Sequence, residues 1–110
     1  MVSLRLYMLQ RITALLMAPL VLGHLAVMIY AIRGGLSAAE ILGRTQGSVA
    51  WFLFYGLFVV AVSVHGAIGL RVIAYEWGGV KGTALDLAMW LVGAGLFALG
   101  SRAVWAVTFA

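Results

Sequence analysis

Long apolar segments separated by short polar stretches run along the chain, and this pattern predicts an all-α membrane protein. Three segments, at about 9–32, 48–76 and 85–107, are each longer than the roughly 20 apolar residues that an α-helix needs to cross a bilayer. Pro19 lies inside the first segment, where we expect a kink, because neighbouring membrane helices satisfy the carbonyl group that proline frees. We therefore expect three transmembrane helices in a single domain over residues 1–110, which forms part of a larger helical bundle.

The polar stretch after the first segment carries the start signal of a short helix. Ser37 and Glu40 have the spacing of a capping box, in which each side chain bonds a backbone N–H of the other residue. This spacing predicts a surface helix at about 38–42, closed by Gly43. The glycine pair at 34–35 is expected to end the transmembrane helix before it.

Glycines and a capping pattern also delimit the third transmembrane segment. The glycines at 78–79 end the second helix, and Thr83 followed by the acidic Asp86 predicts the N-cap of the third. Because the connection is short, the second and third helices are expected to be antiparallel neighbours. The third segment also carries small residues, which suit close helix contact in a membrane: Gly93, Gly95, Ala98 and Gly100.

The composition supports a membrane location and excludes several chemistries. Hydrophobic residues make up 65% of the chain and charged residues 9%, against roughly 25% charged residues in a soluble domain. The chain has no cysteine, so it holds neither a disulfide nor an iron–sulfur cluster of its own. Its charge of +4 comes from lysines and arginines scattered at segment ends, which favours contact with membrane lipid over nucleic-acid binding.

The basic residues also predict an orientation, because three spans place the termini on opposite sides of the membrane. Four basic residues lie on the N-terminal side: Arg5, Arg11, Arg71 and Lys81. Three lie on the other side: Arg33, Arg44 and Arg102. Since cytoplasmic loops carry the excess of positive charge, we expect a cytoplasmic N-terminus in a bacterial cytoplasmic (inner) membrane.

The second apolar segment contains two ionisable residues, His65 and Arg71. Such groups are costly in lipid and usually face a bundle interior, a cavity or a cofactor. Gly69 lies on the same helical face as His65 and leaves space for something flat and bulky, and Arg71 lies nearer the surface, where an arginine can pair with a haem propionate. The pattern favours a haem-binding face. The alternatives are a histidine bonded to a neighbouring helix and an arginine that anchors the helix at the interface.

Two motifs resemble those of the cytochrome b membrane-anchor subunits of succinate dehydrogenase and fumarate reductase. The family pattern His-x-x-x-Gly-x-Arg, followed by an acid, is matched by His65, Gly69, Arg71 and Glu76. The run Gln-Arg-Ile-Thr-Ala at 10–14 is similar to the family's opening motif, an arginine followed by a hydroxyl residue and a small one. The resemblance covers most of the chain. The two motifs lean toward different anchor subunits of the family, and five positions depart from its common pattern: Tyr7, Gln10, Val72, Glu76 and Trp77.

The resemblance implies a role for each matched residue. His65 would be an axial ligand of haem b, Gly69 would pack against the haem, and Arg71 would contact a propionate. Arg11, with Tyr7 as a weaker candidate, would line a ubiquinone or menaquinone site near the cytoplasmic face.

The resemblance also implies the setting in which the chain works. It would be a non-flavin subunit of an oxidoreductase complex in the respiratory chain and the tricarboxylic acid cycle, and it would take part in electron transfer. The catalytic dicarboxylate site would lie on another chain, and a flavoprotein subunit would be one of the partners. An iron–sulfur subunit and a second anchor subunit, which supplies the other haem ligand, would complete the complex.

His24, in the first segment, is a further candidate haem ligand. At about 1.5 Å of rise per residue, His24 and His65 are expected to lie about 8–12 Å apart in depth, which disfavours their sharing one upright haem. The hypothesis that follows is a second haem, held by His24 and by a histidine of a partner subunit. The alternatives are a His24 that bonds another helix, and a single haem.

Other functions remain as alternatives. A subunit of a small proton-coupled exporter has a similar length, but it needs a carboxylate at membrane depth, whereas Glu40, Glu76 and Asp86 all fall in loops or at helix ends. The cytochrome b anchor of another quinone-linked enzyme, such as a hydrogenase or a formate dehydrogenase, is a nearer alternative. A structural anchor without haem is the third.

Overall fold

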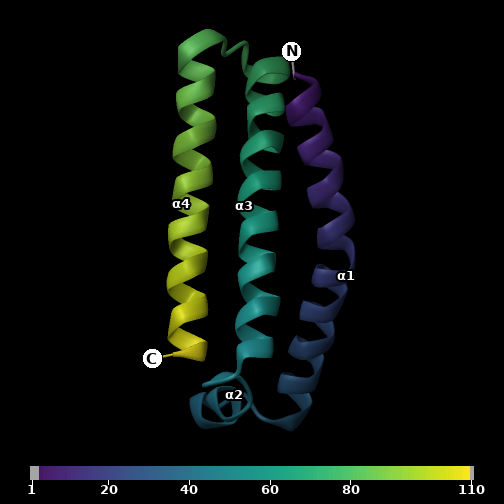
Figure 1. Cartoon of the computed structure of the whole chain (residues 1–110), viewed down its shortest axis with the longest axis vertical. Coiled ribbons are helices and arrows are strands. Elements are labelled where there is room, and N and C mark those ends of the chain that lie inside the picture. Colours follow the sequence, from purple (N-terminus) through teal and green to yellow (C-terminus); the bar gives the residue numbers. More distant parts are fainter. Residues whose placement is uncertain (1–2, 110) are drawn as a thin grey trace.

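Three long helices stand side by side in the computed structural model, which describes residues 3–109 (Figure 1). In chain order, the helices are α1 (Leu4–Gly34), α2 (Ala38–Thr45), α3 (Val49–Gly78) and α4 (Gly82–Thr108). Each of α1, α3 and α4 is long and apolar enough to cross a membrane. The prediction of an all-α protein with three membrane spans is therefore confirmed.

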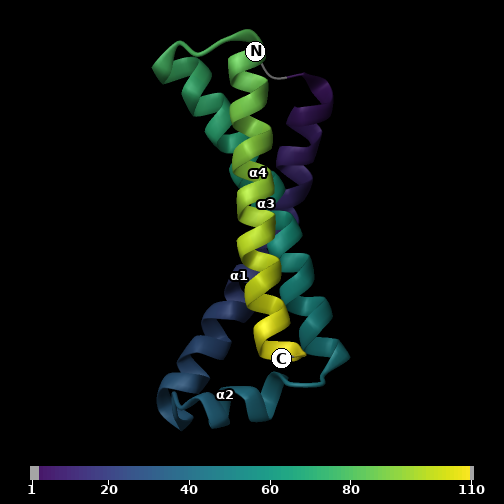
Figure 2. The same ribbon diagram turned by 90° about the vertical axis from the view of Figure 1, so that its left-hand side faces the viewer.

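The central helix is α3, which packs against α4 on one side and against α1 on the other (Figure 1). The N-terminus lies at the same end as the α3–α4 connection, and the C-terminus lies at the opposite end beside α2. Figure 2 shows α2 running across the long axis of the molecule, as a helix at a membrane surface would. The molecule is 47 Å long, which exceeds the roughly 30 Å hydrocarbon core of a bilayer. The ends of the long helices therefore reach beyond the apolar core.

Small residues allow α4 to approach α3 closely. A Cβ atom placed on Gly100 would lie 2.7 Å from Cγ1 of Val59, and one placed on Gly93 would lie 3.3 Å from Cβ of Ala67. A Cβ atom placed on Gly95 would have no neighbouring atom within 4 Å. The prediction that small residues of this segment serve helix contact is thus confirmed at two of its positions.

The C-terminal ends of α1 and α3 follow the predicted glycine signals. Helix α1 begins at Leu4, earlier than the predicted start at about residue 9, because Ser3 caps it by accepting a hydrogen bond from the Leu6 N–H. Helix α1 continues through Pro19, with a bowed axis in Figure 1, and it ends before Gly35, whose φ of +124° suits glycine. Ser48 caps the start of α3 by accepting a hydrogen bond from the Trp51 N–H, and Gly79 closes α3 in the left-handed conformation.

The predicted end of the short helix is wrong. Ser37 does cap α2, since its Oγ accepts a hydrogen bond from the Glu40 N–H at 3.1 Å, but the helix runs past Gly43 to Thr45. The reason is a contact with α4. The Thr45 hydroxyl lies 3.1 Å from the Ile41 carbonyl oxygen and 2.7 Å from that of Val107, so it holds the last turn of α2 against the end of α4.

The predicted N-cap of the third long helix is also wrong. Helix α4 begins at Gly82, before Thr83, and its N-cap position, Lys81, makes no side-chain capping bond. Glycines at both ends of the connection, Gly79 and Gly82, have φ of +66°, so the chain turns tightly and enters the helix earlier than the capping pattern indicated. Asp86 then lies beyond the first turn of α4.

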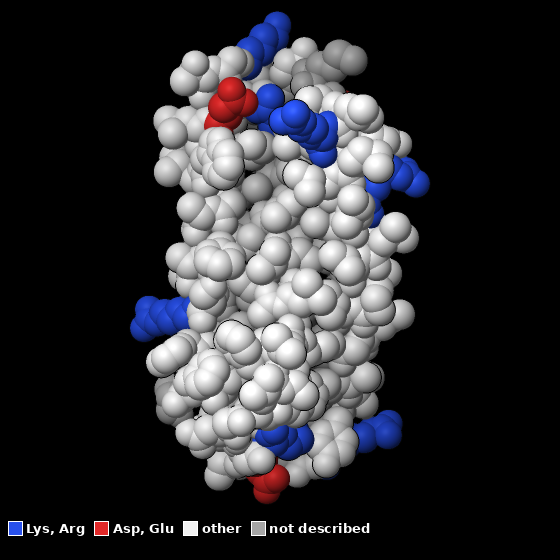
Figure 3. Space-filling view, viewed as in Figure 1, with Lys and Arg blue, Asp and Glu red and all other residues white. Residues whose placement is uncertain are grey.

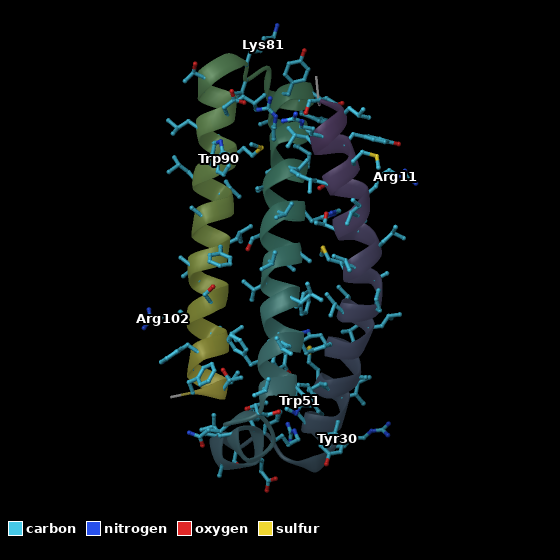
Figure 4. All side chains as sticks on the ribbon, in the orientation of Figure 1. Arg11, Tyr30, Trp51, Lys81, Trp90 and Arg102 are labelled. Carbon is cyan, nitrogen blue, oxygen red and sulfur yellow. The ribbon has the colours of Figure 1, made fainter. Side chains whose placement is uncertain are left out.

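Charged side chains gather at the two ends of the molecule (Figure 3). Figure 4, in the same orientation, identifies an exception: Arg102 projects outward from α4, above the end of that helix. It lies six residues before Thr108, about 9 Å along the helix, so its long side chain can extend to the membrane surface.

Candidate functional site

His65 lies where α3 meets α1, and its ring contacts the side chain of Thr13. The distance from His65 Nδ1 to Thr13 Oγ1 is 3.3 Å. Thr13 is buried, with 6% of its surface exposed, whereas His65 is half-buried. Within residues 3–109, the other ring nitrogen of His65, Nε2, makes no hydrogen bond. The site therefore holds a histidine by one nitrogen and leaves the other nitrogen available to a ligand.

Gln10 fills the space beside Gly69, one turn along α3 from His65. A Cβ atom placed on Gly69 would lie 3.4 Å from Gln10 Nε2, so the missing side chain gives room to an α1 residue. The carbonyl oxygen of the Gln10 side chain, Oε1, is buried and has no hydrogen-bond partner among the described residues. Leaving such an acceptor unpaired costs about 1–3 kcal/mol. A donor from outside the described chain is therefore expected beside Gln10, and the packing of haem on Gly69 stays a prediction.

Arg71 faces α4, in a different direction from His65. Its NH1 atom lies 2.6 Å from Oδ1 of Asp86, and its side chain is only 15% exposed. A guanidinium group has five N–H donors, so one carboxylate oxygen does not exhaust its capacity. The predicted contact with a propionate stays open. What the structure adds is a carboxylate of the same chain that holds Arg71 in place.

Arg11 and Tyr7 lie together on the outer side of α1. Arg11 NH1 donates a hydrogen bond to the Tyr7 hydroxyl at 3.4 Å, and the guanidinium carbon lies 5.8 Å from the centre of the Tyr7 ring. Both residues are exposed, and Figure 4 shows Arg11 projecting away from α3. The two predicted quinone residues are thus brought together, but on the face of α1 that is turned away from His65.

His24 lies among aromatic side chains toward the other end of the molecule. Its ring centre is 5.3 Å from that of Phe58 and 6.3 Å from that of Tyr55, both in edge-to-face geometry. Phe58 precedes His65 by seven residues of α3, which corresponds to a rise of about 10 Å. The two histidines therefore lie at different depths, as the helix count indicated.

His24 also borders a cavity of about 600 Å³ between α3 and α4. The cavity is lined mainly by aliphatic and aromatic side chains, and α2 lies at its end through Ile41 and Thr45. Ligand pockets typically have volumes of about 300–1,000 Å³ and apolar walls with few polar groups. The surroundings of His24 thus have the size and the chemistry of a site for a largely apolar ligand.

Sequence reasoning missed the contact partners of both histidines. In the sequence, Thr13 belongs to a motif but has no assigned role, and Tyr55 and Phe58 carry no functional signal. A threonine buried in a membrane helix bonds its own backbone in many proteins, so its type alone gives no signal of a second partner. Which residue of α1 faces His65 depends on the crossing of two helices, and that crossing becomes visible only in the structure.

Comparison with known proteins gives a family match. The sequence model of the family described as the succinate dehydrogenase/fumarate reductase transmembrane subunit matches residues 2–105. Neither a curated protein nor a solved structure matches the chain.

Proposed function

The chain belongs to the family of succinate dehydrogenase/fumarate reductase transmembrane subunits, and on this premise we propose that it is a haem b-containing membrane anchor of a succinate:quinone oxidoreductase. The observation that carries the proposal is the environment of His65. Its Nδ1 contacts Thr13, while its Nε2 has no partner within residues 3–109. Imidazole nitrogen is a common axial ligand of haem iron. A histidine held in this way at a helix interface is suited to that role.

In the proposed complex, haem b supplies one-electron transfer between the iron–sulfur subunit and quinone. His65 would hold the haem iron through its Nε2 atom. His24 is disfavoured as the opposite ligand of the same haem, because its ring packs on Phe58, about 10 Å along α3 from His65. The opposite ligand therefore comes from a second anchor subunit.

Arg11 and Tyr7 contribute to binding of ubiquinone or menaquinone. A quinone has two carbonyl oxygens that accept hydrogen bonds, and the exposed pair on α1 offers a guanidinium group and a phenol hydroxyl as donors. Arg11 uses its NH1 atom toward Tyr7 and retains further N–H donors. The pair lies near the N-terminal end of α1, and both side chains are exposed, so that an iron–sulfur subunit or a quinone can reach them.

The N-terminal end of the molecule faces the peripheral subunits. It carries the candidate quinone residues, the Arg71–Asp86 pair and several other charged side chains. In a bacterial inner membrane, the excess of four basic residues over three at the other end favours a cytoplasmic position for this end. The flavoprotein with the dicarboxylate site and the iron–sulfur subunit dock there.

A second haem is favoured by the cavity beside His24. Its volume of about 600 Å³ and its apolar walls suit a large flat ligand, and the imidazole of His24 lies at its edge beside Tyr55. A histidine of a partner subunit would complete the ligation.

A difference spectrum tests the proposal. We expect the purified complex, reduced with succinate, to show b-type haem bands in its reduced-minus-oxidised absorption spectrum. His65→Ala should remove or alter these bands, whereas Thr83→Val, at an exposed position of α4, should leave them unchanged. A colourless wild-type complex would contradict the proposal and favour a structural anchor without haem. Haem bands that succinate cannot reduce would favour the anchor of another quinone-linked enzyme.

A further inference from the structure

The hydroxyl of Thr13 has one proton and three neighbours that could share it. Its Oγ1 lies 2.7 Å from the carbonyl oxygen of Leu9, 3.1 Å from that of Gln10 and 3.3 Å from Nδ1 of His65. A backbone carbonyl oxygen can only accept a hydrogen bond, whereas a hydroxyl group can donate one and accept two. The contact with Leu9 is the shortest of the three, so the hydroxyl proton belongs there.

This assignment determines the proton on His65. Because the Thr13 hydroxyl donates its proton to the backbone of α1, its oxygen can only accept a hydrogen bond from the His65 ring. Nδ1 must therefore carry the proton in this contact. A neutral imidazole carries one N–H group, so Nε2 then holds a free lone pair. A haem iron binds a ring nitrogen through such a lone pair.

Burial makes the arrangement stable. Thr13 is 6% exposed, so water does not compete for its oxygen, and the bond to the preceding turn of α1 restricts its side-chain torsion. The other buried hydroxyl nearby on α3, that of Ser63, donates to the Val59 carbonyl at 2.7 Å and, within residues 3–109, makes no hydrogen bond to His65.

We propose that Thr13 is the positioning residue for His65, and that its hydroxyl oxygen accepts a hydrogen bond from Nδ1–H and thereby presents Nε2 to the haem iron. The inference rests on the proposed haem function and names the group that sets the tautomer and the ring orientation. An acceptor on the far N–H of a metal-bound histidine also raises the basicity of the ligating nitrogen. Thr13 would therefore influence the electronic properties of the haem as well as its binding.

His24 provides an internal comparison. Within residues 3–109, its ring makes aromatic contacts with Phe58 and Tyr55 and no hydrogen bond. A change at Thr13 should therefore affect the haem of His65 alone.

Two variants separate this role from simple packing. Thr13→Val keeps the shape of the side chain and removes the hydroxyl group, whereas Thr13→Ser keeps the hydroxyl group. In the assembled complex, we expect Thr13→Val to lower haem affinity by about tenfold. It should also raise the midpoint potential of the haem, because a less basic nitrogen stabilises ferric iron less. Thr13→Ser, which keeps the hydroxyl group, should retain the wild-type potential.

The side-chain ¹⁵N shifts of the full-length chain without haem give a readout that does not depend on the cofactor. We expect the Nδ1–H tautomer of His65 in the wild type and in Thr13→Ser, and a mixture of tautomers in Thr13→Val. An unchanged tautomer together with an unchanged potential in Thr13→Val would overturn the inference. A wild-type complex without haem would instead overturn the proposed function, and with it the ligand role, whatever the ¹⁵N shifts show.

Discussion

Arg71 and Asp86 join α3 to α4 near the N-terminal end of the molecule, with 2.6 Å between NH1 and Oδ1. The two partners differ in exposure: the arginine side chain is 15% exposed and the aspartate side chain is 60% exposed. The pair therefore lies at the boundary between the interior and the surface of the molecule, with Arg71 turned inward and Asp86 turned outward. Because Asp86 engages one nitrogen, it fixes the position of the guanidinium group while other donors stay available.

Substitution of either partner should shift the haem potential, in opposite directions. Arg71→Gln removes a positive charge near the proposed haem, which favours ferric iron and should lower the midpoint potential. Asp86→Asn removes a negative charge and should raise it by a smaller amount, because Asp86 is more exposed. The free energy equivalent to each shift in midpoint potential should be about 1 kcal/mol or less. Redox titration of the purified complex measures the shift. Shifts of the same sign in both variants would contradict this arrangement.

Gly100 should be the most sensitive glycine for the packing of α4 on α3. In Gly100→Ala, the new methyl group would lie 2.7 Å from Cγ1 of Val59, so a helix or a side chain must move. Overpacking of this kind typically costs about 1–3 kcal/mol. Thermal or detergent-induced unfolding, followed by circular dichroism, measures the loss.

The matched control for this change is Gly95→Ala, because a Cβ atom at Gly95 meets nothing within 4 Å. It should leave stability unchanged or slightly raised, since alanine favours the helical conformation. Adding Val59→Ala to Gly100→Ala should recover part of the loss. If both glycine variants unfold at the same point, Gly100 does not set the helix contact.

Most of the fold could be predicted from the sequence because lipid restricts the choice of structure. Apolar segments of more than 20 residues have few alternatives to a membrane helix, and the glycines at 34–35 and 78–79 mark real helix ends. The two errors, at Gly43 and Thr83, have a shared cause. Each of these helix ends depends on a contact or a turn between helices, such as the hydrogen bond from Thr45 to α4. The spacing of residues within one segment gives no information about such a contact.

Only the part of the candidate site that lies on a single helix could be predicted from the sequence. The sequence places His65, Gly69 and Arg71 on one helix, but the directions in which they point depend on the neighbouring helices. His65 meets Thr13 of α1, whereas Arg71 meets Asp86 of α4. Residues on the far side of these contacts could not be identified, because helix crossing is set by side-chain packing over the whole interface.

His24 should determine how many haems the complex holds. If the cavity beside it binds a second haem, His24→Ala should lower the haem content from two per complex to one. The substitution removes a ligand and leaves His65, at a different depth, in place. Quantitation as the pyridine haemochrome, relative to complex concentration, measures the change. One haem per wild-type complex, unchanged in the variant, would show that the cavity serves another purpose.

Removal of the charge at Arg11 should impair quinone reduction without affecting succinate oxidation. Arg11→Gln deletes the charged donor on the outer face of α1, and hydrogen bonds to charged groups contribute about 1.5–3 kcal/mol. We therefore expect kcat/KM for the quinone to fall by about 10- to 100-fold. Tyr7→Phe should have a smaller effect, because it removes one neutral hydroxyl group. Succinate-dependent reduction of a water-soluble quinone analogue measures both.

Arg5→Gln is the matched control for Arg11→Gln. Arg5 is also an exposed arginine of α1, but it lies six residues earlier, away from the Tyr7–Arg11 contact. Its loss should leave quinone reduction unchanged apart from any general effect of surface charge. Reduction of an artificial acceptor that takes electrons directly from the flavoprotein should be normal in all three variants. Equal losses in Arg5→Gln and Arg11→Gln would indicate that surface charge in general, rather than a bond from Arg11, assists the quinone.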